Sequence, residues 1–346
     1  ALVTATPDYS LIKGADLIVE AVFEDKQVKA EAIKKAEAYL DPTSFFGSNT
    51  STLPITELAQ NSNRPASFIG IHFFSPVDRM GLVEIIKGKA TTDETVAKSV
   101  DYVLKIRKTP IVVNDARGFY TSRVFSTYVR EGAIMLAEGV KPTIIENVGR
   151  MTGMPRAPLE MADDVALDLA VKIARATKAD LGPKYQATAA DGVFEAMVNT
   201  FGRQGRKNLK GFYDYPADPK AKKTLWAGLS EIAKPTVLEC APDLRDSYKK
   251  RLLYIQALEA ARCMEEGVIL DPRDADVGSI LAWGFAPYTG GVISLMDCMG
   301  PKKFVAECDA LAEKYGPRFV PCKLLRELAN SGESFYGRFG GQKQAA

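Results

Sequence analysis

Apolar residues recur with two different periods over the first 115 residues of the chain. The run DLIVEAVF (16–23) is short and almost entirely apolar, as in a buried strand, whereas residues 25–40 repeat apolar positions every three or four residues, as a surface helix does. The alternation continues with expected strands at 44–49, 67–74, 82–88 and 109–115 and expected helices at 53–60 and 92–106. Apolar strands that alternate with helices predict a doubly wound, Rossmann-like sheet.

Beyond residue 115 the pattern becomes helical and occurs twice. RVFSTYVREGAIMLAEGV begins at Arg123 and RLLYIQALEAARCMEEGV at Arg251, and aligning the two arginines also aligns the closing Glu-Gly-Val, at a constant offset of 128 residues. Residues 153–163 are echoed loosely by residues 284–297. A repeat in several residues predicts two helical domains related by duplication. Two amphipathic helices that end in glycine by chance are the alternative.

The expected fold class is therefore α/β followed by all-α. We expect residues 1–115 to form the C-terminal part of a Rossmann-like domain, residues 116–240 a first helical domain, and residues 241–346 a second, duplicated helical domain. A chain of 346 residues is long enough for two or three such domains.

Composition narrows the class of protein. The net charge is only +2, with lysines and acidic residues interspersed, so nothing predicts a nucleic-acid partner. The five cysteines form no CxxC pair, which favours buried thiols in a reducing compartment over disulfides, and we expect no metal site. The chain lacks the run of about eighteen apolar residues that a transmembrane helix needs, so we expect a soluble, cytoplasmic protein.

Four segments carry a resemblance to a known family: GSNTSTLPITELA (47–59), GIHFFSPVDRMGLVEII (70–86), TPIVVNDARGFYTSRV (109–124) and GRKNLKGFYDY (205–215). Together they resemble the 3-hydroxyacyl-CoA dehydrogenase family. The duplicated helical part resembles the dehydrogenase half of bacterial multifunctional fatty-acid β-oxidation proteins. The resemblance implies NAD as cofactor, a 3-hydroxyacyl-CoA as substrate, and a fused enoyl-CoA hydratase domain and a thiolase subunit as candidate partners.

One motif of such a domain is missing from the sequence. A dinucleotide-binding domain opens with a strand, a G-x-G-x-x-G turn and a helix. Nothing of that form precedes Asp16. We therefore expect the chain to begin inside the NAD-binding domain, as an N-terminally truncated form that binds NAD poorly.

The strongest candidate chemistry lies at His72, the only histidine, and at Glu84, twelve residues later in the next apolar run. Oxidation of a secondary alcohol requires removal of the hydroxyl proton, and an imidazole accepts a proton near neutral pH. A carboxylate on its other nitrogen fixes the tautomer and stabilises the imidazolium. Neighbouring strands would bring these two side chains together. The alternative is a histidine packed in the core and an unrelated edge glutamate, whereas the resemblance assigns them as base and partner.

The resemblance also assigns residues to the cofactor and to the reacting oxygen. Ser51 would hydrogen-bond that oxygen, although Ser51 and Thr52 also suit the cap of the following helix. The residues that the resemblance places at the cofactor are Glu24, Lys29, Asn49, Ser51 and Lys207. An ordinary exposed helix start is the alternative for Glu24 and Lys29, and a plain surface lysine is the alternative for Lys207.

Two serines depart from the family pattern. Ser75 in HFFSP and Ser122 in GFYTSR stand where the family often has asparagine, and the resemblance places both beside the substrate or the catalytic pair. A serine hydroxyl has a shorter reach than an amide and cannot donate and accept over the same span. We therefore expect an altered chain-length preference rather than lost activity.

The leading hypothesis is an NAD-dependent (3S)-hydroxyacyl-CoA dehydrogenase unit of fatty-acid β-oxidation, with the substrate between the sheet and the helical domains. A truncated, inactive piece that serves only as a folding or assembly module is a second hypothesis. A dehydrogenase for a different small hydroxy acid is a third.

Overall fold

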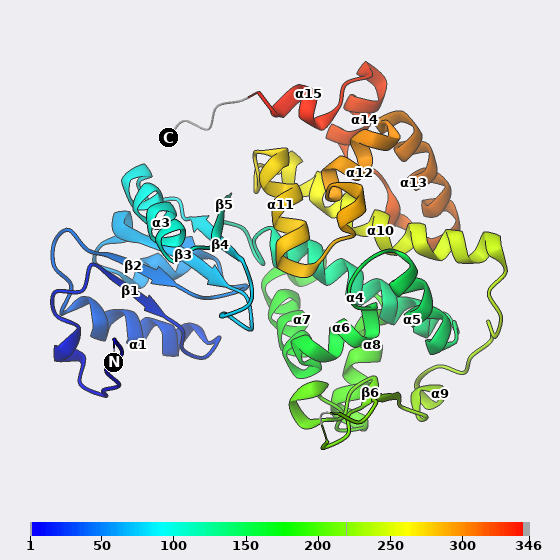
Figure 1. Ribbon diagram of the computed structural model, residues 1–346, viewed down its shortest axis with the longest axis horizontal. Coiled ribbons are helices and arrows are strands. Elements are labelled where there is room, and N and C mark those ends of the chain that lie inside the picture. The colour runs from blue at the N-terminus through cyan, green and yellow to red at the C-terminus, as the bar shows by residue number, and fades with distance from the viewer. Residues whose placement is uncertain (1, 219, 342–346) are drawn as a thin grey trace.

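The computed structural model describes residues 2–218 and 220–341 (Figure 1). A sheet covered by helices forms the N-terminal part, and a larger group of helices forms the rest. The five strands of this sheet are β1 (Leu17–Glu20), β2 (Phe45–Ser48), β3 (Phe68–Phe73), β4 (Leu82–Lys87) and β5 (Thr109–Asn114). They lie side by side in sequence order. Strands β1 to β3 are parallel, β4 is antiparallel to β3, and β5 is parallel to β4.

Helices cover both faces of the sheet, which confirms the predicted Rossmann-like architecture. The helices of this part are α1 (Lys26–Glu37), α2 (Ile55–Leu58) and α3 (Asp93–Lys105). Because successive side chains of a strand point to opposite faces, Phe46 packs in the same buried cluster as Ile33 of α1, whereas Phe45 packs in the cluster of Val103 on α3.

Residues 121–218 and 220–341 are mainly helical and contain one short antiparallel strand pair. The first half contains α4 (Thr121–Ala137), α5 (Pro142–Met151), α6 (Pro158–Val165), α7 (Leu167–Leu181) and α8 (Ala189–Glu195), followed by β6 (Tyr213–Asp214), β7 (Thr224–Leu225) and α9 (Leu229–Ile232). The second half contains α10 (Pro242–Glu265), α11 (Pro272–Trp283), α12 (Val292–Met299), α13 (Pro301–Tyr315), α14 (Lys323–Ser331) and α15 (Phe335–Phe339). Helices α4 and α10 pack against each other at the centre of this part.

Helices α4 and α10 are joined by two reciprocal arginine clamps. Arg251 of α10 donates to Glu131 at 2.6 Å and to Glu138 at 2.7 Å, at the two ends of one stretch of chain. Arg123 of α4 donates to Glu259 at 2.7 Å and to Glu266 at 2.6 Å. These two glutamates lie 128 positions after Glu131 and Glu138, respectively. The two segments that repeat in the sequence therefore contact each other in the same way from both sides.

A second contact pattern also occurs once in each half. One buried carboxylate accepts from a backbone N–H early in a helix and from a tyrosine hydroxyl: Glu146 from Leu159 and Tyr213, and Asp276 from Ile293 and Tyr336. A second carboxylate in each half, buried at Asp163 and half-buried at Asp297, accepts from two successive backbone N–H groups: Asp163 from Phe212 and Tyr213, and Asp297 from Phe335 and Tyr336. The repeat thus extends beyond the two long helices.

One buried apolar cluster runs from the sheet through both helical halves, so the parts share a continuous core. The boundaries at residues 115 and 240 stay a prediction. Among residues 2–218 and 220–341, none of the helices combines the length and the apolar character needed to cross a membrane.

Candidate active site

His72 and Glu84 face each other across the antiparallel pair β3–β4. They are direct partners in the strand register, and the Nδ1 atom of His72 lies 2.9 Å from Oε2 of Glu84. Residues opposite each other on antiparallel strands point to the same face, which brings the side chains together despite their separation in the sequence. The prediction that these two side chains meet is confirmed.

The Glu84 carboxylate is fully buried and is held from the helical part. Its Oε1 atom accepts from the backbone N–H groups of Tyr120 and Thr121, both at 3.0 Å. Its Oε2 atom accepts from the Thr121 hydroxyl at 2.6 Å in addition to His72. These backbone groups lie at the start of α4, where a helix has free N–H groups that favour a negative charge.

The ring of His72 lies near two aromatic side chains. Phe74 is 4.5 Å away and Phe119 6.3 Å away, measured between ring centroids, and His72 itself is only 7% exposed. Because Nδ1–H donates to Glu84, the neutral ring carries its lone pair on Nε2. The pair therefore presents one basic nitrogen with a fixed tautomer.

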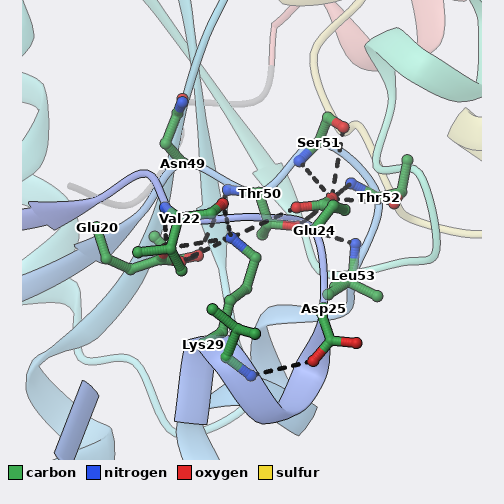
Figure 2. Close-up of polar contacts among 12 residues, drawn as sticks. Glu20, Val22, Glu24, Asp25, Lys29, Asn49, Thr50, Ser51, Thr52 and Leu53 are labelled. Atoms are coloured by element: carbon green, nitrogen blue, oxygen red, sulfur yellow. Dashed lines mark hydrogen bonds and ion pairs between the residues drawn. The ribbon is translucent and has the colours of Figure 1, made fainter. Parts of the chain in front are cut away.

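Ser51 lies in a turn after β2 that is tied to Glu24 (Figure 2). Oε1 of Glu24 accepts from the Thr50 hydroxyl at 2.7 Å, from the backbone N–H groups of Ser51 and Thr52 at 3.1 Å, and from the Thr52 hydroxyl at 3.1 Å. Burial raises the pKa of Glu24, but the Thr50 hydrogen bond and the charge of Lys29 outweigh it, so the pKa lies below its usual range. One carboxylate thus fixes the whole turn.

Lys29 lies beneath Glu24 rather than on the surface. Its side chain is 1% exposed, and Nζ lies 3.1 Å from both carboxylate oxygens of Glu20 and 3.4 Å from Glu24 (Figure 2). Glu20 also accepts from the hydroxyl of Ser48. The alternative of an ordinary exposed helix start is wrong for Lys29, because its ammonium is buried between the buried carboxylate of Glu20 and the partly exposed carboxylate of Glu24.

Asn49 and Ser122 tie this turn to its neighbours. Oδ1 of Asn49 accepts from the backbone N–H of Phe73 at 2.8 Å, which joins the end of β2 to the end of β3. The hydroxyl of Ser122 donates to the backbone carbonyl of Ser51 at 3.1 Å. The first turn of α4 therefore contacts both the Ser51 turn and, through Thr121, Glu84.

Ser75 and Lys207 lie apart from these contacts. Ser75 is exposed in the loop between β3 and β4 and precedes a cis proline. Nζ of Lys207 lies 2.9 Å from Asp168, at the start of α7, and the lysine side chain is 57% exposed. The structure thus brings together His72, Glu84, Ser51, Asn49, Glu24, Lys29 and Ser122.

The expectation that Thr52 caps the next helix is wrong. Helix α2 begins at Ile55, and Asp115 accepts the N–H groups of Ile55 and Thr56 at 2.9 and 2.7 Å. Thr52 lies too far ahead of the helix, beyond Pro54, and its hydroxyl donates to Glu24. Sequence reasoning also missed Thr121, although it lies inside the quoted segment GFYTSR beside Ser122.

The fold and the site together define the class of enzyme. A Rossmann-like sheet joined to a helical bundle, with a histidine–carboxylate pair at one end of its strands, is the arrangement of a nucleotide-dependent alcohol dehydrogenase. The family models agree: residues 1–116 match the NAD-binding domain of 3-hydroxyacyl-CoA dehydrogenase, and residues 118–215 match its C-terminal domain. The chain belongs to the 3-hydroxyacyl-CoA dehydrogenase family.

Curated relatives and solved structures agree with this assignment. The fatty acid oxidation complex subunit alpha of Shewanella frigidimarina is 39% identical over 336 residues, which cover 97% of this chain and 46% of the relative. The chain thus spans about half the length of the curated relatives it matches.

Two solved structures show how much of the fold is shared. A 3-hydroxybutyryl-CoA dehydrogenase from Escherichia coli covers 94% of this chain and 84% of its own at a TM-score of 0.77, and its 22% identity shows the fold alone. An (S)-3-hydroxybutyryl-CoA dehydrogenase from Ralstonia eutropha is 31% identical and covers 61% of this chain and 74% of its own, at a TM-score of 0.57.

Proposed function

We propose that this chain is the (3S)-3-hydroxyacyl-CoA dehydrogenase unit of a fatty-acid β-oxidation protein. The observation that carries the proposal is the buried contact of 2.9 Å between Nδ1 of His72 and Oε2 of Glu84. The family and the subunit-alpha relatives supply the substrate class, a 3-hydroxyacyl-CoA thioester that is oxidised to the 3-ketoacyl form.

In this mechanism Nε2 of His72 takes the proton of the 3-hydroxyl group. Glu84 stabilises the imidazolium that forms, because a carboxylate in a dry site lowers the free energy of an adjacent positive charge. The hydroxyl of Ser51 donates to the reacting oxygen, and the contacts of Glu24 with the Ser51 turn keep that hydroxyl in place. Residues of this chain thus remove the hydroxyl proton and orient the reacting oxygen.

The loops after β1 and β2 fit the nicotinamide half of NAD. They follow the carboxyl ends of parallel strands, where α/β sheets bind ligands, and they offer a partly exposed carboxylate at Glu24 beside the exposed ring of Phe23. Glu24, Asn49 and Ser51 would hold that half, while Lys29 would act through Glu24 because its ammonium is buried. The chemistry that bound NAD supplies is acceptance of the hydride. Lys207 as a further cofactor contact remains a prediction.

Ser75 and Ser122 are proposed to face the acyl-CoA. Because a serine hydroxyl is shorter than the asparagine amide that the family often has there, the preferred acyl-chain length is expected to differ. A fused enoyl-CoA hydratase domain and a thiolase subunit are the proposed partners, since the curated relatives are subunits of an oxidation complex. A cytoplasmic location is proposed from the five free cysteines.

Substitution of the base tests this proposal. His72→Gln should lower kcat for a 3-hydroxyacyl-CoA by about 10²- to 10⁴-fold, because glutamine cannot take the proton. NAD affinity, measured by titration calorimetry, should change little, since Glu24 and the Ser51 turn are untouched. A panel of small 2-hydroxy acids should give no turnover with either protein. An unchanged kcat in His72→Gln would overturn the assignment.

A further inference from the structure

We propose that Thr121 is a positioning residue of the His72–Glu84 pair: its hydroxyl shares the carboxylate oxygen that supports the base, and so sets how strongly Glu84 stabilises and orients the imidazole ring. The inference rests on the proposed function. Thr121 touches neither His72 nor the reacting atoms, and it acts through Glu84.

The contacts around Glu84 carry this assignment. Oε2 of Glu84 accepts from the Thr121 hydroxyl at 2.6 Å and faces Nδ1 of His72 at 2.9 Å. Thr121 is 1% exposed and Glu84 0% exposed, so water does not compete for this oxygen. The other oxygen, Oε1, is occupied by two backbone N–H groups that no side-chain substitution removes. Among residues 2–218 and 220–341, the hydroxyl is therefore the one donor to Glu84, besides His72, that depends on a side chain.

A second donor on Oε2 changes what the carboxylate does for the histidine. A hydroxyl that donates to a carboxylate stabilises its negative charge and draws electron density from the shared oxygen. The imidazolium that forms when His72 takes the proton then gains less from Glu84 than it would from an unshared oxygen. The hydrogen bond from Thr121 also fixes the plane of the Glu84 carboxylate. The carboxylate in turn orients the imidazole ring of His72, so that Nε2 points toward the substrate hydroxyl.

Two titratable groups of the described residues that interact electrostatically with Glu84 do not account for such an effect. They are the phenol of Tyr120, beside α4, and the thiol of Cys263 on α10. Burial raises the pKa of Tyr120 and of Cys263 well above their usual values, so both stay neutral near neutral pH. The nearby guanidinium of Arg123 is neutralised by Glu259 and Glu266.

Thr121→Val removes the hydroxyl and keeps the shape. We expect the acidic limb of the kcat/KM profile to move to higher pH by about 0.5–1 unit, because Oε2 then serves the imidazolium alone. We expect kcat to fall by about 10-fold while KM for the acyl-CoA stays within about two-fold, since the ring is less well aligned. Thr121→Ser, which restores the hydroxyl, should recover both the limb and most of kcat.

Thr127→Val is the matched control. Thr127 lies on the same helix, and its hydroxyl donates to the carbonyl of Val124 at 2.7 Å, away from Glu84. Its pH profile should match that of the unaltered protein, and thermal melting of all the variants identifies any that fail to fold.

The outcomes separate this inference from the proposed function. If His72→Gln is inactive but Thr121→Val keeps the original limb and kcat, Thr121 has no positioning role. A moved limb that Thr121→Ser does not recover would equally overturn the role of the hydroxyl. If His72→Gln stays active, the proposed function itself fails, whatever Thr121→Val does.

Discussion

Helices α4 and α10 are the two copies of one repeated segment, and they differ where each meets its surroundings. Both carry the arginine and the two glutamates of the reciprocal clamp. Two residues ahead of the arginine, however, α4 has Thr121, its first residue, whereas α10 has Lys249 inside a helix that begins at Pro242. The copies thus share their packing and differ in their first turn.

The difference explains why α4, and not α10, can donate backbone hydrogen bonds to Glu84. A helix has free backbone N–H groups only in its first turn, because further along each N–H bonds the carbonyl four residues back. Tyr120 and Thr121 lie at such a start and donate to Glu84. At Lys249 the helix is already formed, so a carboxylate would find no free donor there. Packing is retained in both copies, while the contact with the sheet depends on where the helix begins.

The largest expected difference between the two helices is in how much their arginine clamps contribute to the free energy of unfolding. Arg251 and Glu131 are 0% and 1% exposed, whereas Arg123, Glu259 and Glu266 are 19%, 16% and 50% exposed. Arg251→Met should lower the free energy of unfolding by about 3 kcal/mol, near the lower end for breaking a buried pair, because Arg318 still bonds Glu131. Arg123→Met should lower it by roughly 1 kcal/mol, since water replaces part of the lost contact.

Urea unfolding of the two variants measures the difference directly, provided that the slope with denaturant stays the same. Equal losses from Arg251→Met and Arg123→Met would show that the clamps are energetically symmetric and that their difference in burial does not matter.

The sequence predicted the repeat from its pattern alone, because a constant offset of 128 residues marks the two copies. Periodicity also predicted the strands and helices of the sheet part, which agree with the structure. The pairing of His72 with Glu84 needed more: two neighbouring strands made it possible, the family resemblance favoured it, and the register of the structure provides it.

The contacts that position the site were not predictable in this way. Tyr120, at the start of α4, offers no side-chain cap, and the cap comes from Glu84, 36 residues upstream. The start of α2 is capped by Asp115, 60 residues downstream. A helix capped by a distant segment shows no local start signal, so the role of Thr121 and the error at Thr52 have one physical cause.

The next largest effect is expected on the pH dependence of stability, at the buried carboxylates Glu146 and Asp276, which hold corresponding places in the two halves. Burial raises the pKa of Glu146 to about 7, against the hydrogen bonds from Tyr213 and Leu159 that lower it. The folded state therefore binds more protons than the unfolded chain between about pH 4.5 and 7, so stability falls as the pH rises through this range. Glu146→Gln imitates the protonated form and should reduce the loss of stability between pH 5 and 8 by about 2 kcal/mol.

Asp276 holds the corresponding place in the second half, and burial also raises its pKa. Asp276→Asn should change the pH dependence in the same direction. Thermal unfolding at several pH values compares the two variants. A steeper loss of stability with rising pH in Glu146→Gln would contradict the sign derived for the first half.

The smallest effect is expected at Lys249 and Lys250, the positions of α10 that correspond to Thr121 and Ser122 of α4. Lys249 and Lys250 are 36% and 43% exposed, and Lys250 pairs with Glu307 at 2.9 Å, a surface contact worth about 0.2–1 kcal/mol. Lys249→Thr with Lys250→Ser gives α10 the residues of α4 without giving it a free helix start. We expect kcat and the pH profile to stay within about two-fold and about 0.2 unit of the unaltered protein.

Thr121→Lys supplies the opposite exchange in the first copy, where a buried ammonium replaces the hydroxyl next to Glu84. That variant should lose most of its turnover, because the lysine charge pairs with the carboxylate that supports His72. If the double substitution in α10 alters turnover as much as Thr121→Lys does, the corresponding positions of the two helices are not functionally different. The position of the helix start would then not explain why α4, and not α10, contacts the His72–Glu84 pair.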